Sequence, residues 1–196
     1  MPVHPTAIDG LLVVEWPVHD DERGFFRQTF QTAELEETLG RPVTWQQGNH
    51  ARSAPGVVRG FHAEPWDKLV QVVRGTAMAA IADVRPDSAT FGAVETFHLG
   101  DVDGGRVALF VADGLGNAYA TYGDDEVDYV YTVSRAWFPG ADKRAVAWDD
   151  PDLAVAWPVD DPHLSDADRA NPTLRDRFPD HARFATTAPT TTGSAT

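Results

Sequence analysis

A stretch without any acidic residue runs from position 38 to position 63, in a chain that carries 30 acidic and 16 basic residues overall. Its basic and imidazole side chains are Arg41, His50, Arg52, Arg59 and His62. A guanidinium group matches phosphate oxygens geometrically, and a neutral imidazole can accept a proton. The stretch therefore predicts a site for an anionic ligand beside a candidate base. Chance clustering of solubilising side chains is the alternative interpretation.

Residues 56–75 have the spacing of the first sequence motif of the cupin superfamily, in which two histidines and a glutamate bind a metal. His62 keeps the first histidine, whereas Glu64 and Lys68 replace the other two ligands. A second motif of that superfamily ends at Asn117, where a third histidine would stand. A catalytic metal needs about three converging ligands, and an ammonium group repels a cation. We therefore expect no metal and no cofactor, because His62 and Glu64 could contribute two metal ligands at most.

Eight short motifs follow one another in order: Asp21-Glu22-Arg23-Gly24-Phe25-Phe26, Gln47-Gly48-Asn49-His50-Ala51-Arg52-Ser53, Arg59-Gly60-Phe61-His62, Lys68-Leu69-Val70, Asp83-Val84-Arg85, Trp148-Asp149-Asp150, Trp157-Pro158 and Leu164-Ser165-Asp166-Ala167-Asp168. This series resembles the dTDP-4-dehydrorhamnose 3,5-epimerase family of sugar-nucleotide epimerases, over roughly residues 8 to 175. The resemblance implies an all-β, cupin-type double-stranded β-helix, or jelly roll, with a few short peripheral helices. It also implies a homodimer and a dTDP-4-keto-6-deoxyhexose substrate.

A hexose with a ketone at C4 has acidic protons on C3 and C5, and a neutral imidazole can remove either one to leave an enolate. His62 is the predicted base, with a buried core histidine as the alternative. The resemblance implies that Asp150 lies beside His62 and stabilises its charged form. Lys68 is expected to stabilise the enolate oxygen in place of a metal. An edge-strand lysine that prevents aggregation is the alternative for Lys68.

Inversion requires the returning proton to reach the opposite face of the sugar, so a second acid is needed. Tyr131 matches the family's tyrosine, and a phenol is protonated at neutral pH. Tyr129 lies on the same face of a regular strand, so an aromatic packing stripe is the alternative. The choice of Tyr131 over Tyr129 depends on an apparent one-residue insertion.

The resemblance further implies a set of substrate-binding residues: Arg23, Gln28, Gln47, Asn49, Arg59, Asn117 and Trp137. Arg59 and His62 are an odd number of residues apart and would face opposite sides of a regular strand, so we expect a bulge or bend near Gly60. Asn117 replaces a histidine and Gln28 a glutamate that many relatives carry. An asparagine can bond a hydroxyl or a ketone, but it cannot shuttle a proton at neutral pH. Trp137 is expected to stack on the base or the sugar, or to pack in the core.

The resulting prediction is a cofactor-independent isomerase that epimerises C3 and C5 of a dTDP-4-keto-6-deoxyhexose in rhamnose or another deoxysugar pathway. A mono-epimerase acting at C3 or C5 alone is the nearest alternative. A metal-dependent cupin enzyme and a non-catalytic cupin that binds a sugar nucleotide are alternatives of other classes.

Short strands separated by turn residues are expected to position these side chains. The expected strands are 11–16, 68–73, 76–84, 94–99, 106–111, 117–122 and 128–134. One helix is predicted with Thr32 as its N-cap and Gly40 at its end, and a second short one over 165–170. The pattern is typical of an antiparallel sandwich or barrel.

Composition limits the remaining function classes. The net charge of −14 argues against binding to nucleic acid or to anionic membranes. The sequence has no cysteine, which excludes disulfides and thiolate metal sites. No run approaches the length of a membrane span and no signal-peptide pattern is present, so a cytoplasmic location is expected. We expect one domain over residues 1–184 and a disordered tail over 185–196.

Overall fold

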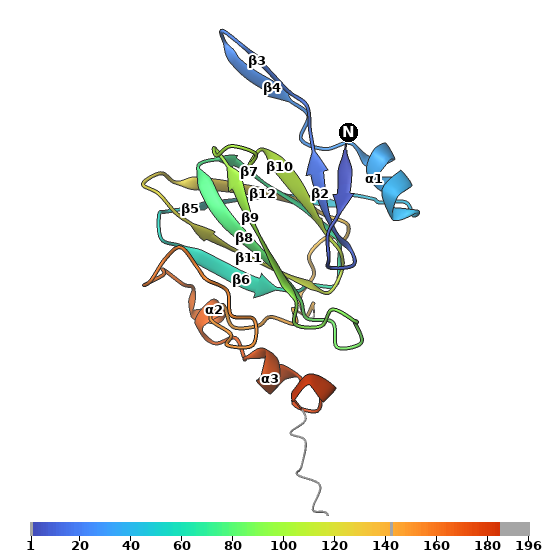
Figure 1. Cartoon of the computed structure of the whole chain (residues 1–196), viewed down its shortest axis with the longest axis vertical. Helices are drawn as coiled ribbons and strands as arrows, with labels where there is room; N and C mark the ends of the chain where they lie inside the picture. Colours follow the sequence, from blue (N-terminus) through green and yellow to red (C-terminus); the bar gives the residue numbers. More distant parts are fainter. Residues whose placement is uncertain (1, 142, 185–196) are drawn as a thin grey trace, which may run out of the picture.

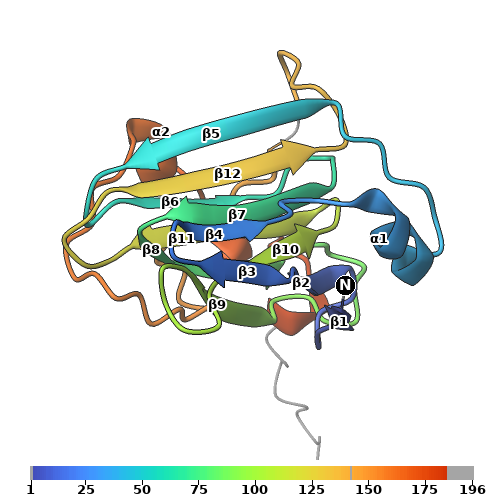
Figure 2. The same ribbon diagram turned by 90° about the horizontal axis from the view of Figure 1, so that it is seen from above.

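The computed structural model describes residues 2–141 and 143–184, which fold around two antiparallel β-sheets that face each other (Figures 1 and 2). The first sheet has the strand order β1-β2-β10-β7-β12-β5 and the second the order β6-β11-β8-β9. A separate hairpin, β3-β4, projects from one end of the sandwich (Figure 1). This architecture confirms the predicted all-β, cupin-type jelly roll.

The strands of the first sheet are β1 (Val3–Pro5), β2 (Leu11–Glu15), β5 (Gln47–Ser53), β7 (Lys68–Arg74), β10 (Val107–Val111) and β12 (Val127–Val133). Those of the second sheet are β6 (Val58–His62), β8 (Thr76–Asp83), β9 (Val94–Gly100) and β11 (Leu115–Thr121). The hairpin consists of β3 (Val18–Asp21) and β4 (Gly24–Arg27). The helices are α1 (Thr32–Leu39), α2 (Asp166–Arg169) and α3 (Leu174–Arg177), followed by a 3₁₀ turn at Ala182–Phe184.

Alternation along the strands builds one core between the sheets and a second outside the four-stranded sheet. On β8, Ala79 and Ile81 belong to the inner core, whereas Ala80 and Ala82 face the opposite side. The chain that follows β12 covers this outer side and buries Leu174 against it. Burying both faces explains why β8 is a nearly continuous apolar run rather than an alternating one. The covering segment ends with α2 and α3, and α2 lies below β6 in Figure 1.

Helix α1 covers part of the outer face of the six-stranded sheet, where Leu35 is buried. The prediction that Thr32 is its N-cap is wrong by one residue, because the extended residue before the helix is Gln31. Gly40 ends the helix in the left-handed conformation, with φ of 65°, as predicted.

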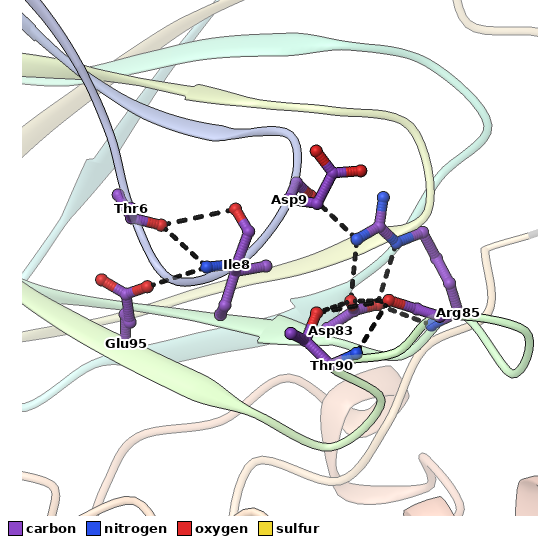
Figure 3. Close-up of polar contacts among 8 residues, drawn as sticks. Thr6, Ile8, Asp9, Asp83, Arg85, Thr90 and Glu95 are labelled. Atoms are coloured by element: carbon purple, nitrogen blue, oxygen red, sulfur yellow. Dashed lines mark hydrogen bonds and ion pairs between the residues drawn. The ribbon is translucent and has the colours of Figure 1, made fainter.

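The Asp83-Val84-Arg85 motif has a structural role at the end of β8. Asp83 is fully buried and accepts hydrogen bonds from Arg85 Nε (2.9 Å) and Thr90 Oγ1 (2.6 Å) (Figure 3). Arg85 also donates to the carbonyl of Asp9 at 2.8 Å, which joins the β1-β2 turn to this end of the sandwich. Burial raises the pKa of Asp83, but these hydrogen bonds outweigh it and lower the pKa to about 2.

The tail predicted over 185–196 lies outside the described residues, and the single domain over 1–184 stays a prediction. In the part of the chain that the structure describes, no helix has the length and apolar character needed to cross a membrane.

Candidate active site

A cavity of about 120 Å³ lies between the two sheets. Its lining residues come from both walls: Ala51, Arg59, His62, Glu64, Lys68, Asn117, Tyr119, Tyr129 and Tyr131. The cavity thus gathers five of the residues that the sequence singled out for chemistry or binding. Its lining combines aromatic rings with amide and charged groups of both signs, which suits a ligand that is neither apolar nor simply anionic.

An extra residue in β6 lets Arg59 and His62 line the same cavity. His62 pairs with Asn117 on β11, whereas Arg59 pairs with Tyr119, so three steps along β6 match two along β11. Gly60 lies between them with φ of 122°, and a Cβ at this position would collide with Ala118. The predicted irregularity near Gly60 is therefore confirmed as a β-bulge.

His62 bonds to an aspartate, but that aspartate is Asp168 and not Asp150. The distance from His62 Nε2 to Asp168 Oδ1 is 2.7 Å. Asp150 instead accepts backbone N–H groups, among them that of Leu153 at 2.9 Å and that of Leu174. The predicted His62–Asp150 pair is wrong because Asp150 holds its own turn together and joins it to the first residue of α3, and it does not line the cavity.

Asp168 is presented to His62 by the first turn of α2. Ser165 caps this helix, accepting from the backbone N–H of Asp168 at 3.1 Å and donating to its carboxylate at 2.9 Å. Burial raises the pKa of Asp168, but the hydrogen bonds from His62 and Ser165 outweigh it and lower the pKa. The ionised carboxylate fixes Nε2 of His62 as a donor, so Nδ1 is the basic nitrogen.

The sequence contains a local signal for Asp168. Asp168 closes the Leu164-to-Asp168 motif, and Ser165 stands three residues before it as in a capping box. What the sequence cannot show is which of the aspartates in the C-terminal segment reaches β6, because that depends on how the segment folds back over the sheet.

Lys68 is the buried cation of the cavity, with a side chain only 4% exposed. Its Nζ donates to the carbonyl of His62 at 2.8 Å and forms an ion pair with Glu64. Burial raises the pKa of Glu64, but the charge and hydrogen bond of Lys68, together with His62, outweigh it and lower the pKa. Lys68 begins β7, which lies between β10 and β12, so the edge-strand alternative for this lysine is wrong.

Two tyrosines of β12, Tyr129 and Tyr131, line the cavity, and their surroundings differ. Burial and the negative charge of Glu64 raise the pKa of Tyr131, which keeps its phenol protonated. Tyr129 is 1% exposed, stacks on Tyr119 with ring centroids 4.0 Å apart, and donates its hydroxyl proton to Asn117 Oδ1 at 3.0 Å. The proton of Tyr129 is thus already engaged, which favours Tyr131 as an acid.

A polar group on the edge strand β5 lies on the same face of the strand as Ala51, which lines the cavity. Gln47 donates to Asn49 at 2.7 Å and accepts the backbone N–H of Trp137 at 2.9 Å. Asn49 pairs with Tyr131 across β5 and β12, which places it on the cavity side of the sheet. Trp137 is 57% exposed, so the interpretation as a core residue is wrong.

Arg59 and the rest of the basic stretch have different partners. Arg59 Nε donates to Ser53 at 3.0 Å and stays in the cavity wall. Arg41 pairs with Asp67 at 2.8 Å, while His50 and Arg52 both bond to Asp128. The stretch is therefore not one anionic-ligand site, because Arg41, His50 and Arg52 bond to aspartates that do not line the cavity.

Two predicted binding residues lie on or beside the projecting β3-β4 hairpin. Arg23 lies at the tip of the β3-β4 hairpin, 83% exposed and paired with Asp21. Gln28 is exposed just after β4. The hairpin projects away from the sandwich in Figure 1, so neither side chain lines the cavity.

The cavity residues do not fit a metal ion. Residues 2–141 and 143–184 contain no group of three or more His, Cys, Asp or Glu able to hold one. Glu64 already binds the ammonium of Lys68, and Nε2 of His62 already bonds to Asp168. The cupin metal position is thus taken by an internal cation.

Comparison with known proteins places this jelly roll in the class of sugar-nucleotide epimerases, which are isomerases. The family model described as dTDP-4-dehydrorhamnose 3,5-epimerase matches residues 5–176. The chain belongs to this family, as its ordered motifs predicted.

Relatives are similar over nearly the whole chain. A dTDP-4-dehydrorhamnose 3,5-epimerase of Shigella flexneri is 34% identical over 86% of this chain and 93% of its own length. A dTDP-4-dehydro-6-deoxyglucose 3-epimerase of a Streptomyces species is 36% identical over 88% of each. A solved 3,5-epimerase of Legionella pneumophila, in complex with dTDP-4-keto-L-rhamnose, has a TM-score of 0.81 at 30% identity and covers 89% of this chain and 93% of its own.

Proposed function

We propose that this chain epimerises C3 and C5 of a dTDP-4-keto-6-deoxyhexose without a cofactor or a metal, in rhamnose or another deoxysugar pathway. The observation that carries the proposal is the placement of a base and an acid on facing walls. His62 belongs to the four-stranded sheet and Tyr131 to the six-stranded sheet, with Lys68 buried at the same cavity. A base and an acid on opposite sides of a sugar are what inversion requires.

Nδ1 of His62 removes the proton from C5 or C3, and Asp168 stabilises the imidazolium that forms. The electron pair of the broken C–H bond forms the enolate double bond, and negative charge develops on the C4 oxygen. Lys68 stabilises that oxygen as a fixed cation. Tyr131 then protonates the carbon from the opposite face, and the phenolate and the imidazolium exchange protons with water before the second carbon reacts.

Polar groups around the cavity support binding of a nucleotide sugar. Arg59 supplies a guanidinium for the diphosphate, while Gln47, Asn49 and Asn117 supply amides for sugar hydroxyls or the ketone. The exposed ring of Trp137, whose backbone N–H bonds to Gln47, offers a stacking surface for the nucleotide base or the sugar.

A homodimer completes this proposal, because a second copy would supply Arg23 and Gln28. The hairpin that carries Arg23 exposes Phe25 (47%) and Phe26 (68%), and such exposed apolar side chains are typical of an interface. The edge strand β5, which flanks the cavity, has one unpaired side for a neighbour. The cytoplasmic location stays a prediction.

Deuterium uptake from heavy water tests the reaction, with dTDP-4-keto-6-deoxyglucose as substrate, NMR and mass spectrometry as readouts, and His62→Ala as control. Uptake at both carbons, lost in the variant, supports the 3,5-epimerase. Uptake at C3 alone would match the activity named for the Streptomyces relative and would replace the proposal by a mono-epimerase. Binding without uptake at either carbon would leave a non-catalytic sugar-nucleotide binder.

A further inference from the structure

Asn117 lies beside the proposed base, and the oxygen of its side-chain amide is hydrogen-bonded. It is the cross-strand neighbour of His62 in the β6-β11 ladder and lines the same cavity as Lys68. Its Oδ1 accepts the hydroxyl proton of Tyr129 at 3.0 Å. Among the described residues, none forms a hydrogen bond with Nδ2 of Asn117, and this nitrogen is not completely buried.

The buried hydroxyl of Tyr129 determines which way this amide points. The described residues offer that hydroxyl no other hydrogen-bond partner. If the amide were reversed, Nδ2 would face the hydroxyl and the tyrosine proton would be left without an acceptor. An unsatisfied buried donor costs about 1–3 kcal/mol, so the orientation with Nδ2 toward the cavity is favoured.

Tyr129 itself is held firmly. Its ring is stacked on Tyr119 with an interplanar angle of 4°, and it is 1% exposed. Burial and the neighbouring phenol raise its pKa far above the ordinary value, so it keeps the proton that it donates. The Tyr129 hydroxyl is thus a rigid, permanent donor behind Asn117.

From this geometry we infer that Tyr129 is a positioning residue that fixes Asn117 as an N–H donor to the C4 oxygen, where the enolate charge develops. The inference rests on the proposed function. A base beside Asn117 reacts at a carbon adjacent to C4, which brings the C4 oxygen within reach of both the amide nitrogen and Lys68. Asn117 then supplies the second, neutral donor beside the cationic one, a task that needs no proton transfer.

A double-mutant cycle measured by deuterium exchange at C3 and C5 tests the inference. Removing one donor to a developing oxyanion costs about 100-fold in kcat, so Asn117→Ala is expected to show a loss of this order. Tyr129→Phe keeps the stacked ring and frees the amide to turn, and we expect about a tenfold loss in kcat. The double variant is expected to equal Asn117→Ala, because Tyr129 acts only through that amide. Tyr122→Phe, which removes a phenol bonded to His98 on the surface, is the matched control.

The inference is overturned if Tyr129→Phe exchanges deuterium at the wild-type rate. It is also overturned if the double variant is slower than Asn117→Ala by the same factor by which Tyr129→Phe is slower than wild type, because independent effects indicate a structural role for Tyr129. Affinity for dTDP, measured by calorimetry, should be unchanged in all variants. If Tyr129→Phe does not fold, Asn117→Asp replaces it, since an ionised carboxylate offers no N–H; a wild-type rate there also overturns the inference. Failure of the wild-type chain to exchange at all would instead refute the proposed function.

Discussion

At the scale of single residues, charged groups of the cavity occur in pairs, and one member of each pair fixes the tautomer or the position of the other. Asp168 sets the tautomer of His62, and Glu64 holds the ammonium of Lys68. The sequence predicted the types of these residues, because few other side chains can serve as an acid, a base or a cation. Their partners were not, since an aspartate's partner depends on a fold-back of the chain that no local pattern records.

Replacing the two aspartates in turn separates chemistry from structure. Asp168→Asn is expected to lower exchange at C3 and C5 by about 10³–10⁴-fold, because an amide holds the imidazole in the wrong tautomer. Asp150→Asn should leave the exchange rate of the folded protein near wild type and lower its melting temperature instead, because its bonds are to backbone N–H groups. The reverse pattern would restore Asp150 as the partner of the base.

Removing the charge of Glu64 tests the role of Tyr131. Burial and, after it, the negative charge of Glu64 raise the pKa of Tyr131, so Glu64→Gln should lower that pKa. Activity that needs the protonated phenol is then lost at lower pH, and the basic limb of the pH–rate profile moves down. At neutral pH the rate should fall by less than about tenfold, because a phenol is still protonated there. An unmoved basic limb would argue against Tyr131 as the acid.

At the scale of elements, apolar strands were predicted well and polar ones were missed. The expected strands around β7, β8 and β10 are present because their alternating or continuous apolar residues face a core. Strand β5 was missed because the side chains that it turns inward, such as Gln47 and Asn49, are polar and face a cavity. The bulge in β6 was predictable, since only an extra residue brings Arg59 and His62 to one side.

The Asp83 network gives an element-scale prediction for stability. Its folded-state pKa of about 2 lies below the value of about 3.9 for an unfolded aspartate, so its stabilisation is complete above about pH 4 and is lost as the pH falls toward 2. Asp83→Asn should lower the free energy of unfolding at pH 7 by about 3 kcal/mol, because Arg85 and Thr90 lose a charged acceptor. Chemical denaturation at pH 7 and pH 3 measures this, and an equal deficit at both values would contradict the ionic cause.

At the scale of the whole molecule, the proposed homodimer implies that one chain alone makes an incomplete site. The fold and the grouping of His62, Lys68 and Tyr131 around one cavity were within reach of the sequence and of family resemblance, whereas Asp168 was not. The separation of Arg23 from the cavity was not, because a sequence does not show whether two residues meet within one chain or between two copies.

Complementation between two inactive variants tests the dimer. Arg23→Ala and His62→Ala should each be inactive, yet co-expressed chains should regain about a quarter of the wild-type activity. Half of randomly assembled dimers are mixed, and each mixed dimer has one site with both residues intact. Light scattering should give the mass of two chains, and Phe25→Ser with Phe26→Ser should give that of one. An absence of complementation in a confirmed mixed dimer would show that Arg23 serves its own chain.

The pairing of His62 with Asp168 joins positions 106 residues apart. During synthesis, the sandwich and most of its ligand contacts can form before the segment that carries Asp168 has emerged. A local opening of that C-terminal segment, at a free energy below that of global unfolding, would disconnect the base while the walls stay folded. Turnover therefore requires the segment that carries Asp168 to be docked, whereas ligand binding does not depend on the His62–Asp168 bond.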